Sequence, residues 1–133
     1  MNKNYLAIIV FSSFLLGGKT NVISNFNTDM SKCKIFADKL KRCEKFTCTY
    51  KTGNPLRKVA VVTRTVHGAK NRKCRVSEVI KNIKQEIVQK NLCKFEAGIL
   101  DSASEAYSYN WMSKEYEIFF DNQVDQGNCK KVQ

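Results

Sequence analysis

Apolar side chains recur at steps of three and four residues near both ends of the chain. Between residues 29 and 45 the apolar positions share one face of a helix, while lysine and aspartate side chains occupy the other face. Residues 98–114 repeat this spacing with alanine and aromatic side chains. A period close to that of the α-helix is typical of an amphipathic helix. The pattern therefore predicts one helix over residues 29–45 and a second over residues 98–114.

The middle of the chain follows a period of two and is rich in β-branched and aromatic side chains, which is typical of strands. Residues 67–71 contain the turn-forming Gly68 and predict a loop. Residues 76–92 fit a helical stripe better than alternation, but a turn at residues 81–82 would make the same stretch a hairpin. Both alternatives stay open. The predicted strands are residues 46–50, 59–66 and 74–80.

These elements predict an α+β fold with an N-terminal helix, an antiparallel sheet of three or four strands and a C-terminal helix, reinforced by disulfides. Residues 118–120 either extend the C-terminal helix or form an edge strand. The residues after Asp121 are polar and predict a polar C-terminal tail, from which Cys129 either reaches back to a partner or stays a free thiol.

The first 18 residues combine Lys3, an apolar run and Gly17-Gly18. A positively charged N-terminal region, a short apolar run and small residues near the cleavage site are the features of a secretory signal peptide. The pattern predicts a signal over residues 1–24, cleaved between residues 18 and 24, and one small α+β domain over residues 25–133. The alternative is an uncleaved N-terminal anchor. The expected product is periplasmic or secreted, with no transmembrane span in its mature form.

Six cysteines follow the predicted signal, and a small exported domain with this many cysteines suggests up to three disulfides. In one helix, Cys33 and Cys43 would lie about 15 Å apart, which is too far for a disulfide. Cys43 could pair with Cys48 and Cys74 with Cys93, or Cys48 with Cys74 or Cys93; reduced thiols in a cytosolic core are the alternative. The spacing argues against zinc. The candidates for disulfides are Cys33, Cys43, Cys48, Cys74, Cys93 and Cys129.

Charge is divided unevenly along the chain, whose formal net charge is +11. Residues 32–94 hold 18 Lys and Arg against four Asp and Glu, whereas residues 96–125 hold one base and seven acids. The two parts could neutralise each other, or they could leave a positive face that attracts an anion. An exported chain would meet anionic envelope components or a protein partner. Nucleic acid is disfavoured as a partner because no RNA- or DNA-recognition motif is present. The alternative interpretation of the charge is a solvated basic surface that binds no ligand.

No catalytic, cofactor-binding or metal-binding residue is assigned from the sequence. His67 is the only histidine and could serve as a general base, but no nucleophile motif accompanies it. No spacing singles out a carboxylate pair for glycoside cleavage. A non-catalytic binding protein is expected, with a nuclease-type hydrolase or a secreted effector acting on a host protein as alternatives. The candidate side chains for these roles are Glu78, Glu86, Glu115 and Glu117 as carboxylates and Phe46, Tyr50, Tyr107, Tyr109 and Trp111 as stacking rings.

Residues 36–50, followed by Lys73-Cys74 and later by the run Cys93-Lys94-Phe95, resemble a group of small uncharacterised periplasmic proteins of alphaproteobacteria, Rickettsia and relatives among them. The resemblance covers about residues 36–110. It implies a helix, an antiparallel meander with a hairpin in the ambiguous stretch, a C-terminal helix and paired cysteines. It implies no activity. Cys33 and Cys129 depart from the pattern and could pair with each other.

Overall fold

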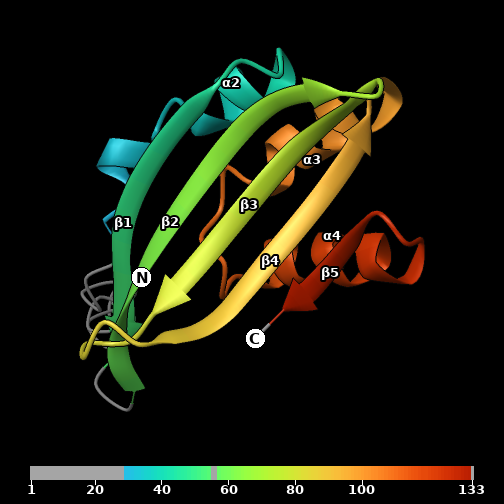
Figure 1. Ribbon diagram of the computed structural model, residues 1–133. Helices are drawn as coiled ribbons and strands as arrows, with labels where there is room; N and C mark the ends of the chain where they lie inside the picture. Colours follow the sequence, from blue (N-terminus) through green and yellow to red (C-terminus); the bar gives the residue numbers. More distant parts are fainter. Residues whose placement is uncertain (1–28, 55–56, 133) are drawn as a thin grey trace, which may run out of the picture.

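A computed structural model describes residues 29–54 and 57–132. Its centre is a five-stranded antiparallel sheet in which each strand pairs with the next one along the chain (Figure 1). The α+β class is confirmed, but the sheet has five strands where three or four were predicted. The predicted signal, residues 1–24, lies outside the described residues. The strands are β1 (Phe46–Asn54), β2 (Arg57–Lys70), β3 (Lys73–Lys81), β4 (Ile87–Glu96) and β5 (Cys129–Val132).

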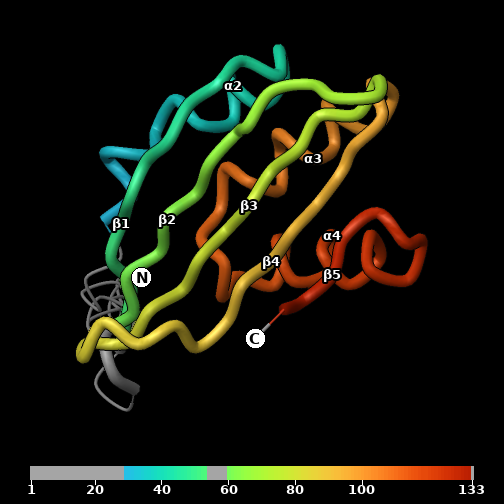
Figure 2. Tube along the Cα trace, in the orientation of Figure 1, coloured from blue at the N-terminus to red at the C-terminus, as the bar shows by residue number. Residues whose placement is uncertain are grey.

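The helical segments lie on one side of the sheet, as the ribbon and the tube both show (Figures 1 and 2). They are η2 (Ser31–Cys33), α2 (Phe36–Lys41), η3 (Ala97–Ile99), α3 (Leu100–Ala106) and α4 (Lys114–Asp125). Among these described helices, none has the length and apolar character required to cross a bilayer. The sheet therefore has a covered face, which packs on the helices, and an open face, which does not.

The N-terminal helix is shorter than the predicted 29–45. Its first turn is the 3-10 segment η2, which a disulfide from Cys33 attaches to Cys48 on β1. Its end is set by Cys43, which has a left-handed backbone with φ 52°. The N–H groups of Cys43 and Glu44 donate to the carbonyls of Leu40 and Lys39, a common way to close a helix.

The ambiguous stretch 76–92 forms a hairpin, and the helical alternative is wrong. Strands β3 and β4 pair from Lys73 with Glu96 to Lys81 with Ile87. The predicted loop 67–71 is also wrong, because β2 continues to Lys70 through a bulge near Gly68. The chain reverses at Asn71-Arg72, where both residues have positive φ. Two residues with positive φ form the turn that best matches the twist of a hairpin.

The predicted helix 98–114 divides into two parts. The first part, α3, ends at Ala106, and Ser113 then caps α4 by accepting a hydrogen bond from the Tyr116 N–H. Residues 118–120 belong to α4 and form no edge strand. The predicted polar tail after Asp121 belongs to regular elements of the fold. Its residues complete α4, turn at Gly127 with φ 82°, and enter β5.

All six cysteines are paired, which confirms a disulfide-reinforced domain. The disulfides are Cys33–Cys48, Cys43–Cys74 and Cys93–Cys129. The first two attach the N-terminal helical region to β1 and β3, and the third attaches β5 to β4. The structure contradicts the pairs Cys43–Cys48, Cys74–Cys93, Cys48 with Cys74 or Cys93, and Cys33–Cys129. It confirms that Cys33 and Cys43 do not pair.

Strand β3 shows how the two faces are formed. Its residues are alternately half-buried and buried from Lys73 to Lys81, as expected for a sheet covered on one face. Side chains such as Val76 and Ile80 enter a core shared with Phe36, Leu40 and aromatic rings from the C-terminal helices. The intervening side chains reach the open face. On β3 and its neighbouring strands, the open-face side chains include His67, Arg75, Ser77, Leu92, Lys94 and Lys130.

Candidate functional site

The covered face holds a buried polar cluster, which we define as Arg64, Glu78, Asn91, Tyr50, Tyr107 and Tyr116. Arg64, Glu78 and Asn91 lie opposite one another on β2, β3 and β4. Arg64 Nε donates to Glu78 Oε2 at 2.7 Å, and Asn91 Nδ2 donates to Glu78 Oε1 at 2.8 Å. The Tyr116 hydroxyl also donates to Glu78 Oε1. Both carboxylate oxygens of Glu78 therefore accept hydrogen bonds inside the core.

The guanidinium of Arg64 lies between aromatic rings. Its central carbon is 5.1 Å from the ring centre of Tyr50, 5.0 Å from that of Tyr107 and 5.3 Å from that of Tyr116. Its Nη1 donates to the Tyr107 carbonyl at 2.7 Å. Burial raises the pKa of all three tyrosines, so the hydroxyls stay protonated. Burial, the largest single influence, lowers the pKa of Arg64, but the charge and hydrogen bond of Glu78 together with Tyr50 and Tyr116 outweigh it, and the net shift is upward.

The buried cluster cannot contact a ligand in this conformation. Arg64 and Glu78 are both 0% exposed, and Asn91 and the three rings are nearly so. A buried ion pair with satisfied oxygens is a structural unit whose disruption leaves an uncompensated charge. Glu78 is therefore a structural residue, although the sequence made it a candidate for paired-carboxylate chemistry.

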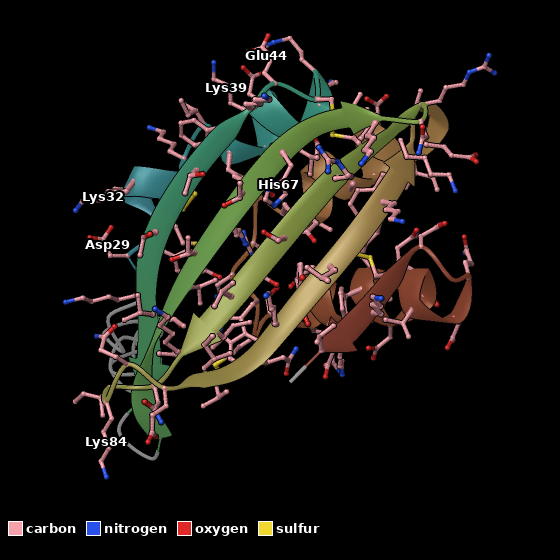
Figure 3. The ribbon with its side chains drawn as sticks, viewed as in Figure 1. Asp29, Lys32, Lys39, Glu44, His67 and Lys84 are labelled. Carbon is pink, nitrogen blue, oxygen red and sulfur yellow. A yellow bond between two sulfur atoms is a disulfide. The ribbon has the colours of Figure 1, made fainter. Side chains whose placement is uncertain are left out.

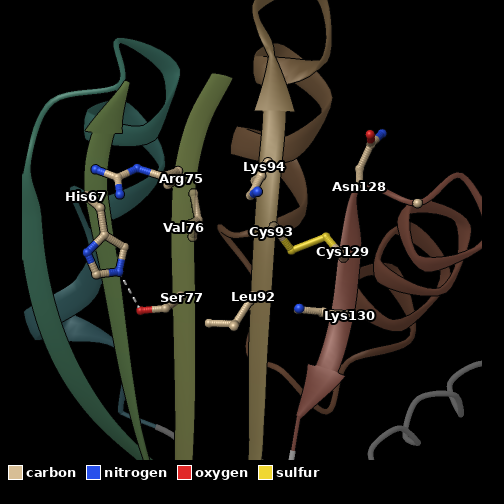
Figure 4. Close-up of a pocket in the computed structure, with 11 residues that line it drawn as sticks. His67, Arg75, Val76, Ser77, Leu92, Cys93, Lys94, Asn128, Cys129 and Lys130 are labelled. Carbon is tan, nitrogen blue, oxygen red and sulfur yellow. Dashed lines mark hydrogen bonds between the residues drawn. A yellow bond between two sulfur atoms is a disulfide. The ribbon is translucent and has the colours of Figure 1, made fainter. Parts of the chain in front are cut away.

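The open face holds a hollow of about 420 Å³ that spans β2 to β5 (Figure 4). Its side chains come from four strands because the register places them at the same level of the sheet. Arg75 lies opposite Gly68, beside the bulge that contains His67, and Leu92 lies opposite Lys130. We call this the cationic hollow. The side chains relevant to its chemistry are His67, Arg75, Ser77, Leu92, Lys94 and Lys130.

His67 is the one titratable group of the hollow whose charge changes near neutral pH. Its Nε2 lies 2.8 Å from Ser77 Oγ on the adjacent strand. Partial burial, and then the positive charge of Arg75, lower its pKa below the ordinary 6.5. The imidazole is therefore neutral at pH 7 and can share one hydrogen bond with Ser77 and another with a ligand.

A second hollow of about 360 Å³ shares Arg75 and Lys94 with the first. Its other walls are Lys70, Asn71 and Lys73, around the β2–β3 turn. Together the two hollows bring five cationic side chains to one end of the open face: Lys70, Lys73, Arg75, Lys94 and Lys130.

These five cations have no acidic partner within ion-pair distance in the part of the chain that the structure describes. Glu96 lies opposite Lys73 in the β-ladder, but the two form no ion pair. Arg75 Nε is buried without a hydrogen-bond partner. A buried donor without a partner is energetically costly, and an anion in the hollow could satisfy it.

The acidic C-terminal part does not neutralise this surface. Within the described ranges, one ion pair joins the basic and acidic parts, Lys41 with Asp101 at 3.9 Å, and both side chains are exposed. The remaining pairs lie within the basic part, such as Arg42 with Asp38 and Glu44. Of the two interpretations of the uneven charge, the structure favours a positive face.

The other residues considered from the sequence do not gather in one place. Glu86 lies in the β3–β4 turn, and Glu115 and Glu117 lie in the first turn of α4. Tyr109 is exposed, whereas Trp111 is half-buried and packs against the core. Phe46 is half-buried and packs on Phe36, and Tyr50 is buried, so neither ring is a wall of the cationic hollow.

Sequence reasoning singled out His67 but missed the residues around it. A usable signal was present in β3, where Arg75 and Ser77 alternate with the apolar positions Cys74 and Val76. The same alternation places Lys94 on the open face. What the sequence did not provide was the register that brings β5 and Lys130 beside β4.

Comparison with family models, with curated proteins and with solved structures found no match to this chain. The similarity to alphaproteobacterial periplasmic proteins therefore stays a prediction, and the function has to be argued from the geometry of the hollows.

Proposed function

We propose that this chain is a non-catalytic exported protein whose open face binds a phosphate-rich anion of the cell envelope. The observation that carries the proposal is the convergence of Arg75, Lys94 and Lys130 around the cationic hollow, with no carboxylate within ion-pair distance of their charged groups among the described residues. Free cations at close spacing raise the local concentration of anions and strengthen each contact with them.

The donor set suits phosphate groups. The planar guanidinium of Arg75 matches two phosphate oxygens, and lysines add point charges around it. His67, Ser77 and Asn71 supply neutral hydrogen-bond donors at the same surface. The proposed ligands therefore share phosphate or a similar anion and include phospholipid head groups, lipopolysaccharide phosphates and anionic wall polymers.

The disulfides support an envelope location. Three disulfides in so small a domain are typical of an oxidising compartment, where such ligands occur. The finer assignment to the periplasm or the exterior also depends on the predicted signal over residues 1–24.

A nuclease is the second candidate, because His67 lies beside Arg75 in a surface that attracts phosphate. Hydrolysis of a phosphodiester by acid–base catalysis uses a base and an acid, and the walls of the cationic hollow contain no carboxylate and no other histidine. The purified protein is expected to leave RNA and single-stranded DNA intact with and without divalent metal. Cleavage that disappears in His67→Ala would replace the binding proposal with this one.

Binding of a short polyphosphate chain, measured by calorimetry over a salt series, tests the proposal directly. The double variant Arg75→Gln/Lys94→Gln should weaken binding roughly tenfold or more, because charge-assisted hydrogen bonds are lost. The control Lys34→Gln/Lys114→Gln removes the same charge from exposed positions outside the hollows and should change affinity by about twofold or less. Equal losses in the two variants would contradict a site on the open face.

A further inference from the structure

The β3–β4 turn carries exposed apolar side chains at the end of the sheet away from His67. Ile83 is 62% exposed, and Ile87 and Val88 at the start of β4 are 45% and 43% exposed. Figure 3 shows Lys84, the residue after Ile83, projecting from this end of the sheet. We call residues 81–90 the hairpin tip. Three exposed apolar side chains within six residues are a candidate contact surface, whereas single scattered ones need no explanation.

Four backbone N–H groups of the hairpin tip donate hydrogen bonds within the turn. Asn82 Oδ1 accepts from the N–H groups of Lys84 and Glu86, and the Asn82 N–H donates to the Glu86 carbonyl. The Gln85 N–H donates to the Asn82 carbonyl. A backbone that is hydrogen-bonded internally can leave water at a much lower cost than one that is not. The turn can therefore present Ile83 to an apolar medium.

Cations surround these apolar side chains. Lys84 lies at the apex, Lys81 is the last residue of β3, and Lys90 is the fourth residue of β4. Ile83 and Gln85 also share a hollow of about 790 Å³ with Lys32, Lys51 and Asp29. The acid within the tip is Glu86, whose Oε1 accepts a hydrogen bond from Asn82 Nδ2. The hairpin tip therefore combines exposed apolar side chains with neighbouring lysine side chains.

We propose that the hairpin tip inserts Ile83, Ile87 and Val88 into the head-group region of an anionic lipid bilayer. Apolar side chains with flanking lysines are the combination that binds such an interface, because the apolar groups leave water while the ammonium groups stay at the lipid phosphates. This inference goes beyond the proposed function, since it concerns the other end of the sheet and a contact that a phosphate polyanion alone cannot provide.

A bilayer fits the tip better than a protein groove does. The apolar side chains project from a turn and its first strand residues, whereas an apolar protein interface requires a broader surface to be stable. Positive charge around the tip complements anionic lipid head groups, and each lysine near such a surface strengthens binding several-fold. A protein partner remains one of the outcomes that the test below distinguishes.

The experiment uses vesicles of phosphatidylglycerol and phosphatidylcholine, with phosphatidylcholine alone as the neutral reference. Co-sedimentation of the disulfide-bonded protein gives the partition coefficient. Ile83→Ser should lower partitioning into the anionic vesicles roughly tenfold, from the loss of apolar burial. Ile118→Ser is the matched control, because Ile118 is 56% exposed but lies on the acidic helix α4. That variant should change partitioning by about twofold or less.

Insertion depth gives a second, independent readout. Trp111 is the only tryptophan, so Trp111→Phe provides a silent background for a single probe. In that background, Ile83→Trp should shift its emission to the blue and be quenched by brominated acyl chains, whereas Ile118→Trp should do neither. An unquenched probe at residue 83, or equal partitioning of the two serine variants, would overturn the inference and leave a protein partner for the tip.

The two proposals fail in distinguishable ways. Polyphosphate has no acyl chain, so its binding reports on the cationic hollow alone. Retained polyphosphate binding with no effect of Ile83→Ser on vesicles would remove only the membrane inference. Lost polyphosphate binding with Ile83-dependent insertion would remove only the proposed function.

Discussion

The two faces of one sheet use arginine in opposite ways. On the covered face, Arg64 is fully buried, bonded to Glu78 and surrounded by tyrosine rings. On the open face, Arg75 lies on the next strand with no ion-pair partner in the described part of the chain. The first arginine forms an ion pair and two hydrogen bonds inside the fold, and only its Nη2 is left there without a partner. The second forms no ion pair among the described residues and is available to a ligand. Sequence charge alone does not distinguish these two cases.

The comparison also separates stability from function. Removing a partner from the buried cluster should damage the fold, because a charge would remain without compensation in the core. Removing a charge from the cationic hollow should damage binding and leave the fold intact. The predictions below test this separation, from the largest expected effect to the smallest.

Glu78→Gln should lower the free energy of unfolding by about 3–5 kcal/mol, since it leaves the Arg64 charge buried without its carboxylate. Chemical denaturation measures the change. The control is Glu44→Gln, which breaks a 2.8 Å ion pair with Arg42 on the exposed surface and should have a small effect. Similar losses in both variants would mean that burial does not distinguish the two pairs.

The double variant Arg64→Met/Glu78→Gln sharpens the same point. It removes both charges but keeps an amide oxygen that can accept from Asn91 and Tyr116. Part of the stability lost in Glu78→Gln should return, because no buried charge is left unpaired. A double variant less stable than Glu78→Gln would show that contacts of Arg64 other than the ion pair dominate.

Replacing both Cys93 and Cys129 with serine tests how β5 completes the open face. The loss of this cross-link should cost about 2–4 kcal/mol of unfolding free energy. It should also weaken polyphosphate binding, since β5 supplies Lys130 and one wall of the hollow. The corresponding change at Cys43 and Cys74 should lower stability similarly, but β5 would stay in place. Equal effects of the two changes on binding would contradict this role of β5.

Arg75→Gln/Lys94→Gln should leave the unfolding free energy within about 0.5 kcal/mol of the parent, because neither side chain is engaged in the core. The same variant should lose most of its polyphosphate binding. A large loss of stability would show that these cations support the fold and would end the contrast between the two faces.

His67 gives the smallest but most local signal. Arg75→Gln should raise the pKa of His67 only part of the way to 6.5, because partial burial is the larger cause of the lowered pKa. Bound polyphosphate should raise it as well. The neutral imidazole is favoured in the folded state, so its contribution to stability is present above the ordinary pKa and declines as the pH falls through the lowered one. NMR titration of the single histidine measures each shift, and a fall in pKa on ligand addition would contradict a site beside His67.

The α+β class and the disulfide reinforcement followed from the sequence, because hydrophobic periodicity and cysteine number are local signals. The failures have tertiary causes. The stripe at residues 76–92 satisfied helical spacing, yet long-range pairing with β2 overrode it and Asn82 closed a hairpin. The residues after Asp121 looked like a tail because β5 is held to the sheet by a disulfide to Cys93, which is distant in sequence.

The candidate site was less predictable than the fold. The basic excess over residues 32–94 was visible, but which cations are buried, paired or free depends on strand register. Arg64 and Glu78 did carry a signal in the sequence. The residues two positions before and after each of them on its strand are apolar, so the alternation places both side chains at core positions. A polar residue at a core position of one strand predicts a partner on the next. Applied to β2 and β3, this rule would have identified the buried pair.

The most direct test of the central claim is to map polyphosphate binding on the backbone amides of the intact protein by NMR. The account predicts that the shifted amides gather at His67, Arg75, Ser77, Lys94 and Lys130, while those of α2 and α4 stay unchanged. Shifts centred on the helical side, or spread evenly over every exposed lysine, would contradict a binding site on the open face.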